Sequence, residues 1–107
     1  MPKLAEISTI ASDDAPISVV QDLANYEKFA CQINYGVGTG TTAVLQVSLD
    51  GINFVYLSGS SQALDNAGGT HIWNVSDAIF PWLKVAITGD AVGIEVIFAG
   101  DPRPRRD

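Results

Sequence analysis

The 107-residue chain has few of the residue types on which catalytic and metal sites depend. It contains one cysteine, Cys31, and one histidine, His71. A single cysteine excludes a disulfide within the chain and a cysteine-based zinc cluster. A hydrolytic triad around His71 would need a nucleophile turn such as G-x-S-x-G, which the sequence lacks. We therefore expect no enzymatic activity and no catalytic, cofactor-binding or metal-ligating residue, with His71 a surface or partly buried strand residue.

Positive charge is scarce over most of the chain. Residues 1–100 hold three lysines against ten acidic residues, and the three arginines all lie in the last seven residues: Arg103, Arg105 and Arg106. Nucleic acid is not an expected partner of such an acidic body, because affinity for it comes mainly from cationic groups that meet phosphates. The basic segment is either a solvated terminus or an extended arm for an acidic groove or nucleic acid, and its arginines are interface candidates.

Long apolar runs are absent as well. The first ten residues, "MPKLAEISTI", have no apolar core of a signal peptide, and no run of 18 apolar residues occurs that could span a membrane. We expect a protein made in a cytoplasm, without a membrane partner. At 47% hydrophobic and 17% charged residues, the chain should fold as a single domain, with a core at about 4–100 and a tail at 101–107.

Convincing helical periodicity is missing from every segment of ten or more residues, and the one hint, at 18–28, fits a loop equally well. Apolar and polar residues instead alternate with a period of two, which predicts half-buried strands. These strands are expected at 27–35, 42–49, 81–88 and 92–98, with others at 17–20, 54–57 and 70–75 and an edge strand or arm at 4–10. Seven or eight short antiparallel strands indicate an all-β, jelly-roll-like β-sandwich, with a closed barrel as the alternative.

The stretch "VLQVSLDGINFVYL" at 44–57 raises the question of whether Asp50-Gly51 is a ligand site. A calcium loop needs oxygen ligands at alternating positions, and Leu49 and Ile52 break that pattern. Asp-Gly between two alternating strands favours a hairpin with a type I′ turn, which has positive φ at both central residues. We expect this turn to bring Leu45, Val47 and Phe54 into the core.

The sequence leaves open whether the aromatic residues of the predicted strands are buried or exposed. Trp82 lies on the strand face opposite Leu83 and Val85, so it points outward if those two residues face the core. Exposed aromatic side chains on a β-sandwich bind protein partners or sugar rings. Trp73, Trp82 and Tyr56 are therefore interface candidates, with burial in the jelly roll as the alternative. Cys31, within "FACQINY", is predicted to be a small buried residue.

The motif S-x-D-G-x-x-[FW] is carried by Ser48, Asp50, Gly51 and Phe54. It is followed by an aromatic-x-[KR]-V strand at Trp82, Lys84 and Val85, a turn at Gly89 and a last strand from Ile94 to Phe98. This succession, over about the C-terminal two-thirds of the chain, resembles small virion proteins of tailed bacteriophages. Carbohydrate-binding and discoidin-like sandwiches use similar hairpins.

The resemblance implies a non-enzymatic virion structural protein, of the capsid decoration or cement, head-fibre or tail accessory type. Such proteins commonly act as symmetric oligomers, often trimers, that bridge the major capsid protein or other virion subunits. We therefore expect a homo-oligomer, with a trimer favoured, located in the virion. The alternative is a carbohydrate- or receptor-binding tail or fibre module that uses the aromatic side chains as platforms.

Overall fold

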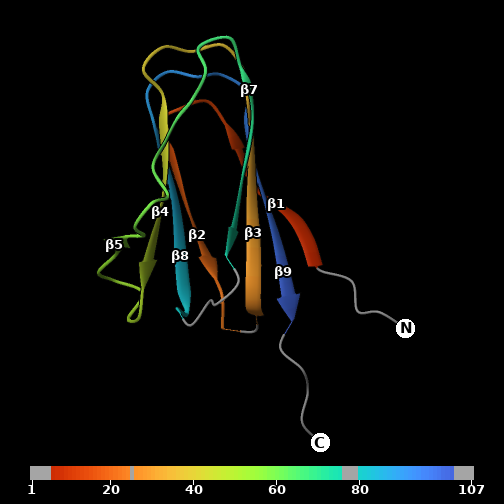
Figure 1. Cartoon of the computed structure of the whole chain (residues 1–107), viewed down its shortest axis with the longest axis vertical. Coiled ribbons are helices and arrows are strands. Elements are labelled where there is room, and N and C mark those ends of the chain that lie inside the picture. The colour runs from red at the N-terminus through yellow and green to blue at the C-terminus, as the bar shows by residue number, and fades with distance from the viewer. Residues whose placement is uncertain (1–5, 25, 76–79, 103–107) are drawn as a thin grey trace, which may run out of the picture.

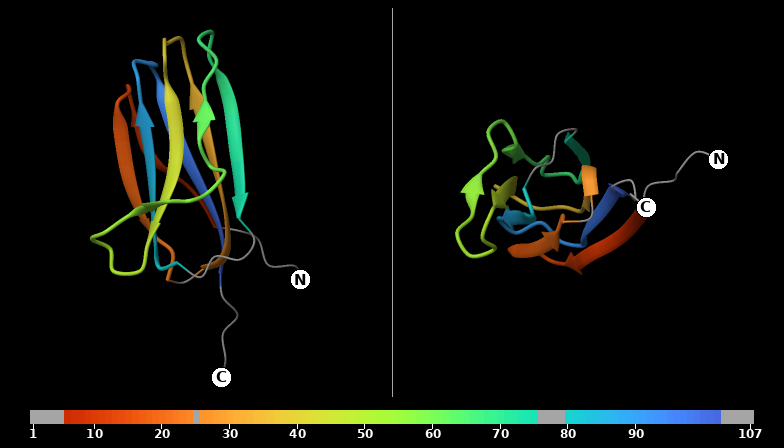
Figure 2. Two further views of the ribbon diagram at one scale, coloured as in Figure 1. Left: turned by 60° about the vertical axis from the view of Figure 1, so that its left-hand side comes forward. Right: turned by 90° about the horizontal axis from the view of Figure 1, so that it is seen from below.

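The computed structural model describes residues 6–24, 26–75 and 80–102, which form two antiparallel sheets packed face to face (Figures 1 and 2). The strands are β1 (Glu6–Asp13), β2 (Ile17–Asp22), β3 (Tyr26–Tyr35), β4 (Thr42–Ser48), β5 (Val55–Tyr56), β6 (Gln62–Ala63), β7 (Gly69–Val75), β8 (Trp82–Thr88) and β9 (Ile94–Pro102). The predicted strands are all present, and β6, of two residues, is an addition to them.

The first sheet, here sheet A, has the strand order β1-β9-β3-β7, and the second, sheet B, has the order β2-β8-β4-β5 with β6 also paired to β4. The chain crosses from one sheet to the other at most of its connections, which is the winding of a jelly roll. The predicted fold class is thereby confirmed. The described residues contain no helix, and the segment at 18–28, where a helix was one of two alternatives, holds β2 and the start of β3.

The core lies between the sheets and is made by the inward side chains of the alternating strands. Its members include Phe29, Cys31, Ile33, Leu45, Val47, Leu83, Val85, Ile87, Ile94, Val96 and Phe98. These are the residues that the period-two pattern placed inward. Cys31 is 0% exposed, and burial raises the pKa of its thiol to about 12, so it packs as the small buried residue that was predicted.

The inward pattern fails at two positions that were predicted to follow it. Leu49 lies one residue beyond the end of β4, and Val92 lies two residues before the start of β9. Both side chains are exposed, because the chain has already left the sheet at these positions and no longer alternates between its faces. At the C-terminal end, β9 continues to Pro102, two residues past the expected limit of the core. Arg103, Arg105 and Arg106 lie outside the described residues.

Candidate interaction surface

The hairpin between β4 and β5 has a longer loop than the Asp-Gly pair indicated. The last paired residues before and after it are Val47 and Val55, so the hairpin itself is confirmed. The type I′ turn is wrong, because Gly51 has φ 75° while no non-glycine residue in the described ranges has a positive φ. The chain instead makes a loop over residues 49–54 that projects from one end of the sandwich (Figure 1).

The side chain of Asp50 closes this loop from within. Its Oδ1 accepts hydrogen bonds from the Ile52 and Asn53 amides and from Ser48 Oγ, each at 2.8 Å, and its Oδ2 accepts one from Asn53 Nδ2 at 3.0 Å. Ser48 Oγ in turn accepts bonds from the amides of Asp50 and Gly51, at 3.2 and 2.9 Å. These hydrogen bonds stabilise a loop longer than a two-residue turn, because the Asp50 carboxylate holds the backbone amides that surround it.

The same bonds bear on whether Asp50 is a metal ligand. Hydrogen bonds from the Asn53 and Ile52 amides hold the pKa of the Asp50 carboxyl well below its usual range, so the group is a carboxylate at neutral pH. Both of its oxygens are directed to groups of the loop. Among the described residues, no three His, Cys, Asp or Glu side chains gather as metal ligands. Asp50 therefore has an architectural role in this loop.

The loop folds back over the outer face of sheet B at two points. A Cβ atom built on Gly51 would lie 2.9 Å from Trp82 Nε1, so the backbone rests directly on the indole ring and glycine is required there. The ring of Phe54 lies under Lys84, whose Nζ is 4.5 Å from the ring centroid, a cation–π contact. The prediction that Phe54 joins the core is wrong, because the ring is held by Lys84 on the outside of the sheet.

Large apolar side chains extend from the loop and from β5 into solvent. Ile52 is 80% exposed, Leu49 74%, Val55 64% and Tyr56 51%. We call these four residues the loop surface. A hollow of about 330 Å³ lies beside them, with walls that include Val47, Leu49, Val55 and Phe80. The left view of Figure 2 shows the loop standing out from the body of the sandwich, where a partner could reach it.

The predicted aromatic candidates are placed differently from one another. Trp73 is only 8% exposed, its Nε1 donates to the Ser60 carbonyl at 2.8 Å, and the half-buried ring of His71 lies edge-on to it at 4.7 Å. Trp73 is thus part of the core, which corrects its selection as an interface residue. Trp82 is half-buried beneath the loop, and Tyr56 is exposed on the loop surface.

Three residues of the loop surface were not selected from the sequence: Leu49, Ile52 and Val55. The available signal was the density of apolar residues on both sides of Asp50-Gly51, with too few polar residues for a solvated hairpin tip. Extending the period-two pattern through Leu49 hid that signal. The error arose because the alternation ends where the ladder ends, at the residues just before the loop.

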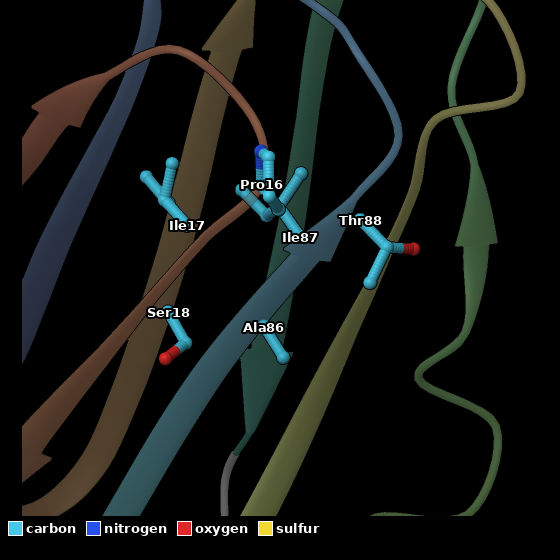
Figure 3. A pocket seen from close by; sticks show the side chains of 6 residues that line it. All are labelled: Pro16, Ile17, Ser18, Ala86, Ile87 and Thr88. Carbon is cyan, nitrogen blue, oxygen red and sulfur yellow. The ribbon is translucent and has the colours of Figure 1, made fainter.

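A second hollow, of about 260 Å³, lies between β2 and β8 near the other end of the sandwich (Figure 3). The residues that line it are Pro16, Ile17, Ser18, Ala86, Ile87 and Thr88. Ser18 and Ala86, which have small side chains, are register partners on the two neighbouring strands. Its lining offers two hydroxyls and no carboxylate, imidazole, thiol or amine, so it has no general acid, base or activated nucleophile.

The described residues thus present an apolar loop, held by hydrogen bonds of its own, that is suited to contact with another surface. No described helix is long and apolar enough to cross a bilayer. Comparison with known proteins yields no relative: no protein-family model matches the chain, and no curated protein sequence matches it.

Proposed function

We propose that this protein is a non-enzymatic structural subunit of a tailed-bacteriophage virion, of the capsid decoration or cement type. Its role would be to stabilise the head by bridging subunits of the major capsid protein, as a homo-oligomer assembled on the virion. The observation that carries the proposal is the loop surface, an exposed apolar patch on a loop that its own hydrogen bonds hold in shape.

The energetics of such a surface favour a protein partner. Burying one large aliphatic side chain contributes about 1.5–3 kcal/mol, and the loop surface presents four large apolar side chains. The internal bonds of Asp50 fix the loop before binding, so less conformational entropy is lost on contact. Membrane insertion is less favoured, since the net charge of −6 opposes approach to anionic lipid.

Several of the residues that carry the resemblance to phage virion proteins hold the loop that presents this surface. Ser48 and Asp50 supply the bonds inside the loop, Gly51 allows the backbone to rest on Trp82, and Phe54 packs under Lys84. The residues of the motif S-x-D-G-x-x-[FW] therefore make the contacts that hold this projecting loop in shape. Virion proteins of the resembled kind bridge neighbouring subunits, and an exposed apolar loop is a surface that can make such a contact.

The alternative, a carbohydrate- or receptor-binding module, has less support. Sugar rings are bound by exposed aromatic faces, and of the three aromatic candidates only Tyr56 is more than half exposed. Trp73 is buried, and Gly51 packs against the half-buried ring of Trp82. A glycan site would thus depend on a single tyrosine whose hydroxyl already accepts a bond from the Ser61 amide at 3.2 Å.

The test is binding of the purified protein to heads of the encoding phage that lack it, measured by co-sedimentation and located by electron microscopy. The wild type should bind saturably, and Ile52→Asp should reduce the affinity at least about tenfold, since it would bury an unpaired charge. Val37→Asp is the matched control: Val37 is 67% exposed in a loop at the opposite end, so affinity should be unchanged. Absence of head binding, or saturable glycan binding lost with Tyr56→Ala, would overturn the proposal.

A further inference from the structure

The outer face of sheet A is nearly free of charge across its middle. The outward residues of the four strands form rows that the register defines. One row is Ile7, Ala99, Ala30 and Asn74, and the next is Thr9, Ile97, Gln32 and Ile72. Ile7 and Ile72 are well exposed, and no described strand lies over this face in Figure 2. A sheet face with an uncharged middle and exposed isoleucine side chains can associate with another protein surface.

The two rows differ in height. Ala99 and Ala30 are small and form the floor of a hollow of about 160 Å³, which Lys28, Asn74 and Asp101 help to line. The neighbouring row, with Ile97, Gln32 and Ile72, stands beside it as a ridge of longer side chains. A ridge and a hollow side by side on one surface are what a two-fold contact requires, because each copy then supplies the ridge for the other's hollow.

We propose that the outer face of sheet A is a contact with a second copy of this chain, related by a two-fold axis that runs across the strands. In this arrangement Ile97 faces Ala99 of the second copy and Gln32 faces its Ala30. An axis along the strands would instead set Ala99 against Ala30 and Ile97 against Gln32, leaving a gap in one row and crowding in the other. This inference does not depend on a role in the virion.

The charged residues stand at the two ends of the face, away from its centre. Lys28 and Asp101 are register partners at one end, and Glu95 lies at the other. The two-fold brings opposite ends together, so that Asp101 faces Glu95 of the second copy, and Lys28, the register partner of Asp101, lies beside this pair and offsets part of the repulsion between the two carboxylates. The charges remain at the rim, where solvent reaches them, and the centre of the contact stays uncharged.

The area of the face indicates how tightly the two copies should bind each other. Strands spaced about 4.8 Å apart, with about 3.3 Å per residue, give a face on the order of 450 Å² per copy for four strands of seven residues. Twice this area is below the roughly 1,200 Å² of stable specific complexes. The dimer should therefore be weak, with a dissociation constant between about 1 µM and about 1 mM, and its fraction should rise with protein concentration.

Sedimentation velocity of the full chain over that concentration range tests the proposal. The wild type should convert from monomer to dimer. Ile97→Ala removes the ridge and Ala99→Ile fills the hollow, so each should raise the dissociation constant about tenfold or more. The double variant exchanges ridge and hollow between positions that face each other, and it should restore much of the lost affinity.

Val20→Lys is the matched control, because Val20 is an exposed β-branched residue on a strand of sheet B. It should leave the dimer unchanged, whereas Ile72→Lys should abolish it. Thermal unfolding of each variant shows that the fold is intact. A wild type that stays monomeric, a trimer, or a dimer that the Ile97 and Ala99 variants do not affect would overturn the inference. Head binding measured in parallel keeps this outcome separate from that of the proposed function.

Discussion

At one end of the sandwich, the loops at 13–16, 36–41, 64–68 and 89–93 are hydrogen-bonded to one another, whereas the loop at 49–54, toward the other end, is bonded mainly within itself. In the linked set, Asp14 accepts a bond from the Gly93 amide, and Asp90 accepts one from the Thr39 amide. Carboxylates thus organise both regions. They join different parts of the chain at one end and a single loop at the other.

This difference separates stability from function. The linked loops close the jelly roll over its core, with Ala91 buried among them, so a change there should disturb the whole fold. The 49–54 loop lies on the outer face of sheet B and carries its apolar residues outward. The loop adds little apolar area to the core and much apolar area to the exposed surface. Apolar residues held in solvent by dedicated bonds are a feature that folding alone does not require.

The largest effect is expected from Gly38→Ala, in the linked loops. A Cβ atom at this position would lie 2.6 Å from the Ala91 backbone nitrogen, and the Gly38 amide also donates to the Asn66 carbonyl at 3.0 Å. We expect the free energy of unfolding to fall by about 2–3 kcal/mol, with a drop in Tm of about 10 °C or more. Urea and thermal unfolding measure both quantities.

Gly40→Ala is the control for this variant. Gly40 lies in the same loop with φ 64° and open space around it, so the substitution adds only the strain of a left-handed residue, about 1–2 kcal/mol. Equal losses for the two variants would show that the contact with Ala91 does not matter, and the contrast between the two ends would weaken.

A smaller effect on stability is expected when residues 49–53 are replaced by Asn-Gly, the two residues that a type I′ turn prefers. Ser48 and Phe54 would then flank a tight hairpin, and the ladder up to Val47 and Val55 would remain. The free energy of unfolding should change by about 1 kcal/mol, because the deleted residues lie outside the core. Head binding should be lost. A loss of stability as large as that of Gly38→Ala would show that the loop is part of the fold.

The sequence predicts most of the fold because alternation records burial directly. Residues such as Ile33, Leu45 and Val85 are apolar at every second position because each faces the other sheet. The pairing of β9 with β1 and β3 could not be obtained in this way, since alternation gives the face of a strand and not its neighbours. The predicted hairpin is confirmed because the alternating pattern marks its two strands. The predicted turn type is wrong because the conformation of the loop depends on the bonds of the Asp50 side chain, which the pattern does not show.

The candidate surface was predicted less well than the fold. Tyr56 was selected from the sequence and is exposed, but Trp73 has the same kind of strand context and is buried. The buried indole nitrogen of Trp73 needs a hydrogen-bond partner, and it finds one in the Ser60 carbonyl, which lies 13 residues away in the chain. Such a contact is set by the packing of a distant turn and leaves no local pattern. Leu49 and Ile52 were missed because the alternation was extended past the end of the ladder at Val47, which hid the apolar density around Asp50-Gly51.

The smallest effect is expected from acid acting on Asp50. Hydrogen bonds lower the pKa of this carboxyl in the folded chain below the value of about 3.9 that it has when unfolded. The loop bonds are therefore fully present above pH about 4 and are lost as the pH falls through the lower, folded pKa. NMR titration of the Ile52 and Asn53 amide protons should show no transition between neutral pH and about pH 4, and a transition only below it.

Asp50→Asn makes the same test at neutral pH. The amide keeps one acceptor oxygen but places an NH₂ group opposite Asn53 Nδ2, which now donates to the carboxylate. Hydrogen exchange of the Ile52 amide should become faster, while the Tm changes little, because the bonds that are lost join residues 48–53 only to one another. A titration of Asp50 near pH 4 would mean that the loop bonds do not persist in solution, and the loop surface would then lose the rigidity on which its proposed role depends.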